Sequence, residues 1–143
     1  MQDSLITAET SVLDYGCGQG DDVRRLQEQG IPCVGWDPFF SPSVDRQQSD
    51  VVNLGYVVNV IENAAERAKT VNDAWSLAKK LLIISARLTS NLDGRIRLPF
   101  ADGYLTRRGT FQSSMSSKSS GIGLMPRSAS RAWQLLPERN RPQ

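Results

Sequence analysis

Residues 11–21 read SVLDYGCGQGD, and this stretch decides the fold of the chain. A short apolar run is followed by three alternating glycines, Gly16, Gly18 and Gly20. Glycine adopts backbone angles that a side chain would forbid, so this spacing predicts a tight turn that approaches a ligand closely. The helix that begins after the turn would direct its unpaired N–H groups into the loop. The stretch therefore predicts a strand, a nucleotide-type cofactor loop and a helix. The alternative is a plain turn between strand and helix.

The spacing of the glycines separates two classes of cofactor loop. A dinucleotide-binding loop follows the pattern G-x-G-x-x-G and cradles a pyrophosphate. Here the third glycine comes one position early, Asp21 stands where that pattern requires glycine, and Asp14 places a carboxylate two residues before the loop. A carboxylate would repel a pyrophosphate, but it suits S-adenosylmethionine, which carries an amino group and a sulfonium. The pattern resembles motif I of class I methyltransferases, in which the acidic residue that ends the first strand faces the methionine moiety.

A second candidate ligand follows the next strand. Residues 21–29 have the pattern of a short amphipathic helix that stops at Gly30, and an apolar strand over residues 31–36 ends in Asp37. An acidic residue about 20 positions beyond the loop, at the end of the second strand, holds a ribose diol in nucleotide-binding folds. Asp37 is therefore predicted to bind the ribose through both carboxylate oxygens. The alternative is that Asp37 caps a turn before Pro38.

The rest of the chain completes a shortened sheet. A third strand is predicted from Asp50, a long helix over residues 63–80, and a buried parallel strand over the apolar run of residues 81–85. The interval from Asp37 to Asp50 leaves no room for a crossover helix and another strand. We therefore expect an α/β fold, a Rossmann-like class I methyltransferase sheet that lacks the usual third strand and its helix. The expected strand order is 2-1-3-4, with helices on both faces and the ligand at the carboxyl ends of the strands.

The missing unit leaves the adenine side of the expected pocket to the loop from Pro38 to Gln48. Phe39 or Phe40 would stack on the adenine there. The alternative is that both phenylalanines cap the sheet edge.

Composition excludes several other chemistries. The chain has 143 residues, a formal net charge of +2, two cysteines and no histidine. The absence of histidine removes His-based triads, most zinc sites and the commonest general base. Cys17 and Cys33 lack C-x-x-C spacing and are expected to be reduced, small core residues. Without a long apolar run or a signal-like start, the chain is expected to be soluble and cytoplasmic, with no membrane and no metal partner.

Candidate residues for the methyl-transfer step follow the third strand. In amino-methyltransferases that act on DNA, the corresponding strand ends in an Asp/Asn-Pro-Pro-aromatic motif whose oxygens accept hydrogen bonds from the target amine. Asn53-Leu54-Gly55-Tyr56 has the asparagine and the aromatic residue but no prolines. Asn53 and Tyr56 are thus the catalytic candidates; alternatively, Asn53 caps the strand and Tyr56 packs in the core. The predicted cofactor-binding residues are Asp14, Tyr15, Gly16, Cys17, Gly18, Gly20, Asp37, Pro38 and Asn53.

Longer segments carry a narrower resemblance. Residues 11–38, SVLDYGCGQGDDVRRLQEQGIPCVGWDP, residues 49–75 with their segment NLGYVVNVIE, and residues 101–112, ADGYLTRRGTFQ, resemble the DNA phosphorothioation-associated methyltransferase family of bacteria. The resemblance covers Leu5 to Gln112. It implies binding of S-adenosylmethionine and a partner that is DNA or a DNA-modification protein complex. The pair Arg107-Arg108 could meet phosphate, although an arginine pair is more often merely solvated.

The composition changes at Ser113, which divides the chain into a cofactor-binding domain, residues 1–112, and a tail, residues 113–143. The tail is rich in serine, carries five basic residues and one acid, Glu138, and shows no sustained period, so it is expected to be disordered. It has the composition of a nucleic-acid-binding arm, but a one-nucleotide shift in reading frame gives an amphipathic continuation that resembles the family. We therefore expect a frameshifted or truncated product whose sheet ends in an open edge. An inactive cofactor-binding remnant is the alternative to an active methyltransferase.

Overall fold

The computed structural model describes residues 6–86, 98–100, 102–105, 110–113 and 123–126. A five-stranded sheet forms its centre, with four neighbouring parallel strands and one antiparallel strand at an edge. In spatial order the strands are β2 (Cys33–Trp36), β1 (Val12–Tyr15), β3 (Ser49–Gly55), β4 (Ala78–Ser85) and β8 (Gly123–Pro126). The predicted parallel order 2-1-3-4 is confirmed. The fourth strand begins at Ala78, three residues before the predicted start.

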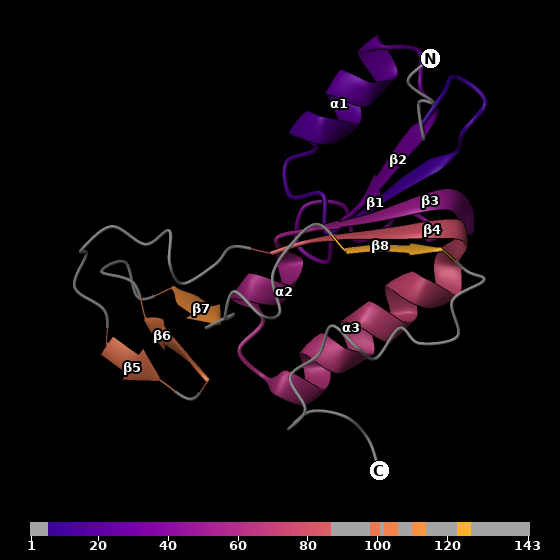
Figure 1. Cartoon of the computed structure of the whole chain (residues 1–143). Coiled ribbons are helices and arrows are strands. Elements are labelled where there is room, and N and C mark those ends of the chain that lie inside the picture. Colours follow the sequence, from indigo (N-terminus) through magenta and orange to yellow (C-terminus); the bar gives the residue numbers. More distant parts are fainter. Residues whose placement is uncertain (1–5, 87–97, 101, 106–109, 114–122, 127–143) are drawn as a thin grey trace.

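Helices cover both faces of this sheet (Figure 1). Helix α1 (Asp21–Glu28) lies on one face, where its partly buried side chains pack against Val12, Cys33 and Val51. Helix α3 (Ala64–Leu77) lies on the other face, and its buried side chains complete the larger core cluster. The largest fully buried side chains belong to that cluster; they are Leu13, Val52, Leu54 and Leu82. The parallel strands are apolar because both of their faces are covered.

The register of β1 against β3 is held by a polar pair at their amino ends. Ser11 donates from its backbone N and its Oγ to Asp50 Oδ2, at 3.1 and 3.0 Å, and Asp50 N donates to Ser11 Oγ at 2.8 Å. Lys80 Nζ lies 2.9 Å from Asp50 Oδ1. Lys80 and Ser11 together lower the pKa of Asp50 to about 2. This anchor sets Val12 opposite Val51 and so brings the carboxyl ends of the two strands together.

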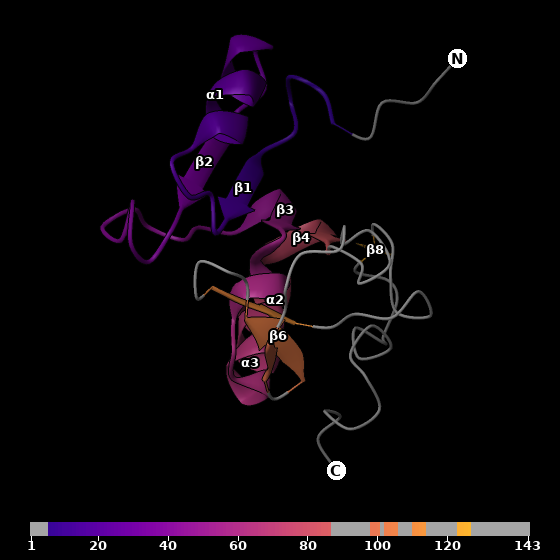
Figure 2. The same cartoon turned by 90° about the vertical axis from the view of Figure 1, so that its left-hand side faces the viewer.

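The sheet is shortened as predicted. The structure describes every residue between β2 and β3, and this interval contains no paired strand beyond an isolated bridge between Asp37 and Ser41. Among the described residues, β2 is therefore an edge strand. Of the segments that the structure describes, the connecting loop is the one beyond β2, and Figure 2 shows it projecting away from β3 and β4.

The other end of the sheet differs from the sequence prediction. Residues 123–126 form β8, which pairs antiparallel with β4. Ser113 ends β7 (Phe111–Ser113), the third strand of a small antiparallel sheet with β5 (Leu98–Phe100) and β6 (Gly103–Leu105). The expectation of a tail without strands is thus corrected at these positions, and the edge of β4 is paired rather than open. Arg107-Arg108 and the rest of the tail lie outside the described residues.

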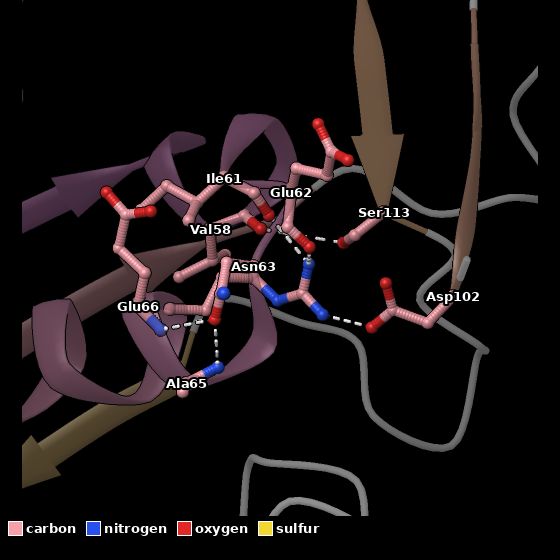
Figure 3. Close-up of polar contacts among 9 residues, drawn as sticks. Val58, Ile61, Glu62, Asn63, Ala65, Glu66, Asp102 and Ser113 are labelled. Atoms are coloured by element: carbon pink, nitrogen blue, oxygen red, sulfur yellow. Dashed lines mark hydrogen bonds and ion pairs between the residues drawn. The ribbon is translucent and has the colours of Figure 1, made fainter. Parts of the chain in front are cut away.

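The small sheet lies against the short helix α2 (Val57–Val60), and a buried arginine of α3 also holds it, through the contacts that Figure 3 shows at Ile61, Glu62 and Asp102. Arg67 of α3 is 5% exposed and donates to the carbonyl oxygens of Ile61 and Glu62, at 2.6 and 3.2 Å. The same guanidinium pairs with Asp102, which lies between β5 and β6. Because three acceptors surround the Arg67 charge, it joins α3 to the small sheet without an unpaired buried cation.

Candidate functional site

The glycine loop connects β1 to α1 at the carboxyl edge of the sheet. Gly16, Gly18 and Gly20 have φ angles of 85°, 55° and 79°, in the left-handed region that favours glycine. At Gly16 the space is also closed, because a Cβ would lie 2.4 Å from Val57 Cγ2. Gly20 occupies the N-cap position of α1, and no side chain caps this helix. The predicted strand, loop and helix are therefore present, and the loop presents backbone rather than side chains at the start of α1.

Asp37 ties this loop to the end of β2. Its Oδ2 accepts a hydrogen bond from Gly18 N at 3.0 Å, and its Oδ1 accepts from Phe39 N at 2.8 Å and Phe40 N at 3.0 Å. Partial burial raises the pKa of Asp37, but these backbone N–H donors outweigh burial, so the pKa is lowered overall. A carboxylate accepts about four hydrogen bonds, so three are in use and the capacity that remains lies at Oδ2. Asp37 thus caps the turn, as the alternative interpretation of the sequence predicted. Its Oδ2 can still accept a hydrogen bond from one ligand hydroxyl.

Cys17 lies in the loop, but its side chain packs behind it. A Cβ at Gly35 of β2 would lie 2.7 Å from Cys17 Sγ, so the thiol occupies the space that this glycine leaves open. Burial is the largest of the effects that raise the pKa of the Cys17 thiol, followed by the charges of Asp14 and Asp37. Both cysteines are free. The Cys17 thiol therefore fills space beside β2.

Asp14 and Asn53 form a buried pair on neighbouring strands. The register places Asp14 of β1 opposite Asn53 of β3, and Asn53 Nδ2 donates to Asp14 Oδ1 at 2.8 Å. Asp14 is 5% exposed, and burial raises its pKa; the Asn53 hydrogen bond lowers it and the Asp22 charge raises it further. Sequence reasoning predicted both residues but not their contact, since the contact depends on strand register. The structure makes Asn53 the partner that keeps the Asp14 charge tolerable inside the sheet.

The two tyrosines have different environments. Tyr15 is 4% exposed and belongs to the core cluster on the α3 face, where its ring centroid lies 4.8 Å from that of Trp36. Tyr56 is 58% exposed and has a φ of 61°, the one positive φ of a non-glycine residue in the described ranges. Its N donates to Ser85 O at 2.8 Å, which places the residue beside the end of β4. Left-handed backbone at a bulky residue is strained and clusters at functional sites.

Arg46 is a residue that sequence reasoning did not single out. Its guanidinium carbon lies 4.5 Å from the centroid of the Trp36 ring, and its Nη1 donates to Tyr15 Oη at 3.2 Å. Such cation–π contacts stabilise by about 0.5–1 kcal/mol at exposed sites. Arg46 therefore fastens the returning end of the loop after β2 to the sheet. An arginine in a polar loop gives no sequence signal for this contact.

The predicted site residues thus gather at one edge of the sheet. Asp14 and Asn53 lie close to the carboxyl ends of β1 and β3, the glycine loop follows β1, and Asp37 joins that loop to the exposed turn that begins at Pro38. Tyr56 follows β3 directly. Among the described residues, no cluster of three or more His, Cys, Asp and Glu side chains is placed to hold a metal ion. No helix of the described ranges is both long and apolar enough to cross a bilayer.

Comparison with known proteins gives the fold. No family model and no curated protein matches the chain. The sugar N-methyltransferase KedS8 from Streptoalloteichus sp ATCC 53650 is 16% identical, with a TM-score of 0.51 over 82% of this chain and 64% of that chain. The CcbJ methyltransferase from Streptomyces caelestis is 14% identical, with a TM-score of 0.50 over 85% of this chain and 70% of that chain. The chain has a Rossmann-like methyltransferase fold. It spans somewhat less than two thirds of the KedS8 structure.

Proposed function

We propose that the protein is an S-adenosylmethionine-dependent methyltransferase that binds its cofactor at the carboxyl ends of β1, β2 and β3. One observation carries this proposal. The glycine loop after β1, with its left-handed glycines, is hydrogen-bonded through Gly18 to the acidic residue that ends β2. In nucleotide-binding α/β folds this is the place where a ribose and its substituents are held.

Asp37, Asp14 and Asn53 have different proposed roles in binding the cofactor. When bound, S-adenosylmethionine supplies an electrophilic methyl group on a sulfonium sulfur. Asp37 accepts one ribose hydroxyl at Oδ2, rather than the diol through both oxygens, because Oδ1 already accepts two backbone N–H groups. Asp14 holds a negative charge at the end of β1, where it attracts the cofactor amino group, and Asn53 positions that carboxylate. Alignment of the reacting atoms is the main requirement for methyl transfer, so no strong base is needed.

Tyr56 and the small antiparallel sheet are proposed to border the methyl acceptor. Tyr56 is exposed at the end of β3, and α2 continues from it toward β7, where Ser113 Oγ lies 3.5 Å from Val58 O. The small sheet therefore stands on the α2 side of the proposed site, away from β2. A Tyr56→Phe variant tests whether the hydroxyl contributes, and Tyr56→Gly relieves the left-handed backbone while it removes the ring.

A pair of glycine substitutions tests the proposal. Gly18 and Gly30 both have positive φ, and a Cβ at either would meet no atom within 4 Å, so alanine costs each a similar strain of about 1–2 kcal/mol. A methyl at Gly18 occupies the loop, whereas Gly30 lies beyond the far end of α1. By calorimetry, S-adenosylhomocysteine should bind the wild type and Gly30→Ala equally, and Gly18→Ala at least about tenfold more weakly. NAD should not bind. Equal loss in both variants, or no binding to the wild type, would contradict the proposal.

The acceptor is proposed to be DNA, on the resemblance of the segments GWDP and NLGYVVNVIE to the phosphorothioation-associated family. The test uses S-adenosylmethionine with a labelled methyl group and two duplexes of the same sequence, with and without phosphorothioate linkages. Label on either duplex supports DNA as the acceptor, and the ratio between them reports the link to phosphorothioation. A chain that binds the cofactor but labels neither duplex is not a DNA methyltransferase.

A further inference from the structure

Val57, the first residue of α2, packs into the space that Gly16 leaves open. A Cβ at Gly16 would lie 2.4 Å from Val57 Cγ2 and 3.6 Å from its Cβ and Cγ1. The valine side chain therefore lies against the bare backbone at the start of the glycine loop. The parallel strands bring the two residues together, because Gly16 directly follows β1 and Val57 follows the end of β3, at the same end of the sheet (Figure 1).

Backbone hydrogen bonds hold the same loop from the side of β2. Trp36 O, at the end of β2, accepts from Gly16 N at 2.7 Å and from Cys17 N at 3.1 Å. Asp37 Oδ2 accepts from Gly18 N at 3.0 Å. These three bonds fix the loop to β2, and the contact with Val57 prevents it from moving toward α2. The start of the loop is thus hydrogen-bonded on one side and packed on the other.

Val57 is itself held in place. Its neighbour Val58 is 2% exposed and belongs to the core cluster on the α3 face, and Val57 packs against the same cluster. The backbone before it is fixed as well, since Tyr56 N donates to Ser85 O at 2.8 Å. Valine in a helix has one strongly preferred χ1 rotamer. A stiff side chain on an anchored helix can therefore define the position of the backbone that it touches.

We propose that Val57 is a positioning residue for the cofactor, whose side chain holds Gly16 where the amino-acid end of the ligand meets the loop. The inference rests on the proposed function, which places that end near Asp14, two residues before Gly16. The ribose is placed at Asp37, which is hydrogen-bonded to the loop without any contribution from Val57. Loss of the Val57 side chain should therefore weaken the hold on the amino-acid half of the ligand and spare the nucleoside half.

The first experiment compares S-adenosylhomocysteine with adenosine, which lacks the amino-acid half, by calorimetry. Val57→Ala removes the side chain that touches Gly16, and Val57→Thr keeps its β-branched shape. Val60→Ala is the matched control, because Val60 lies on the same helix and is 51% exposed. Val57→Ala should bind S-adenosylhomocysteine about 2-fold to 12-fold more weakly, which corresponds to about 0.5–1.5 kcal/mol for ordering one flexible group. Val57→Thr and Val60→Ala should retain the affinity, and adenosine should bind every variant as it binds the wild type.

The second experiment moves a methyl group from α2 to the loop. In Gly16→Ala the new methyl meets Val57, whereas in Gly16→Ala/Val57→Ala it takes the space that the valine vacates. Both variants carry the same left-handed strain at Gly16, so this strain cancels in the comparison. The double variant should bind S-adenosylhomocysteine more tightly than Gly16→Ala, although it carries one more substitution. Val57→Ala should also lower the melting temperature less in the Gly16→Ala background than in the wild type.

Three outcomes would overturn the positioning role and leave the proposed function standing. They are unchanged S-adenosylhomocysteine affinity in Val57→Ala, an equal loss of affinity for both ligands in that variant, and a Gly16→Ala variant that gains nothing from Val57→Ala. Thermal melting checks that each variant folds, and recovery of folding in the double variant, should Gly16→Ala not fold, supports the contact. A wild type that binds neither ligand refutes the proposed function and the positioning role together.

Discussion

The hydrogen bond between Asn53 and Asp14 makes a sharp prediction about stability. Its donor and acceptor are 2.8 Å apart, and the acceptor is a carboxylate that is 5% exposed. A hydrogen bond to a charged group contributes about 1.5–3 kcal/mol. Asn53→Leu keeps a side chain of similar size in β3 but removes the donor. At neutral pH we expect the variant to lose about 1.5–3 kcal/mol of unfolding free energy.

The loss should depend on pH in a defined direction. Burial raises the pKa of Asp14 above its usual value, so the folded protein takes up this proton more readily than the unfolded chain does. The stability linked to Asp14 is therefore greatest below the unfolded pKa and declines as pH rises through the folded pKa. Loss of Asn53 costs the charged form of Asp14 more than the neutral form, because a hydrogen bond to a charged group is the stronger one. The difference between Asn53→Leu and wild type should be large at pH 7 and should shrink as pH falls toward 4.

Urea unfolding followed by tryptophan fluorescence measures this difference at each pH. The double-mutant cycle with Asp14→Asn supplies the control, because a neutral partner makes a hydrogen bond of about 0.5–1.5 kcal/mol. In the Asp14→Asn background, Asn53→Leu should therefore cost less than it does in the wild type. An equal cost at both pH values, together with an equal cost in both backgrounds, would show that Asn53 acts through packing rather than through the charge of Asp14.

Three further predictions follow from single contacts. Gly35→Ala places a Cβ 2.7 Å from Cys17 Sγ and should cost about 1–3 kcal/mol of unfolding free energy. A second change, Cys17→Ala, should restore part of this stability in thermal melts, and no restoration would mean that the strain lies elsewhere. Asp102→Ala removes the half-exposed partner of the buried Arg67 and should cost about 1–2 kcal/mol of unfolding free energy, between the values for exposed and buried pairs. Affinity for S-adenosylhomocysteine should stay within about twofold, and a large loss of affinity would contradict a purely structural role for this ion pair. The pKa of Asp50 is lowered to about 2, so Asp50→Asn should destabilise the protein above about pH 4 and progressively less as pH falls toward 2. A shift in the unfolding midpoint that does not depend on pH would show that the charge of Asp50 does not stabilise the fold.

The sequence predicted the elements whose patterns are local. The glycine loop, the amphipathic helix after it and the apolar parallel strands were each predicted from spacing or composition. The short interval after Asp37 predicted the absence of the usual third strand and its helix. The strands β5, β6, β7 and β8 were not predicted, because each has only three or four residues and carries no period. The start of β4 at Ala78 was also missed, since helical spacing continues past Leu77, where α3 ends.

Side-chain contacts at the site were harder to predict from the sequence than the helices and strands. The prediction that Asp37 lies beside the loop could be made from sequence distance, but its three backbone donors depend on how the turn after β2 folds back. The contact between Asp14 and Asn53 depends on the register of β1 against β3. That register is set by Ser11 and Asp50, which are 39 residues apart in the sequence. Such pairings arise between strands that are distant in sequence, and no local pattern encodes them.

The edge position of β2 has a consequence for self-association. An edge strand offers its unused backbone groups as a template on which another chain can add a strand. Here the template is four residues long, Cys33–Trp36, and prolines stand close to both of its ends, Pro32 directly before it and Pro38 two residues after it. Proline has no N–H to offer a neighbouring strand, so a ladder begun on β2 cannot lengthen through either position. The short edge flanked by prolines thus guards the protein against edge-to-edge aggregation, with no helix or further strand needed to cover it.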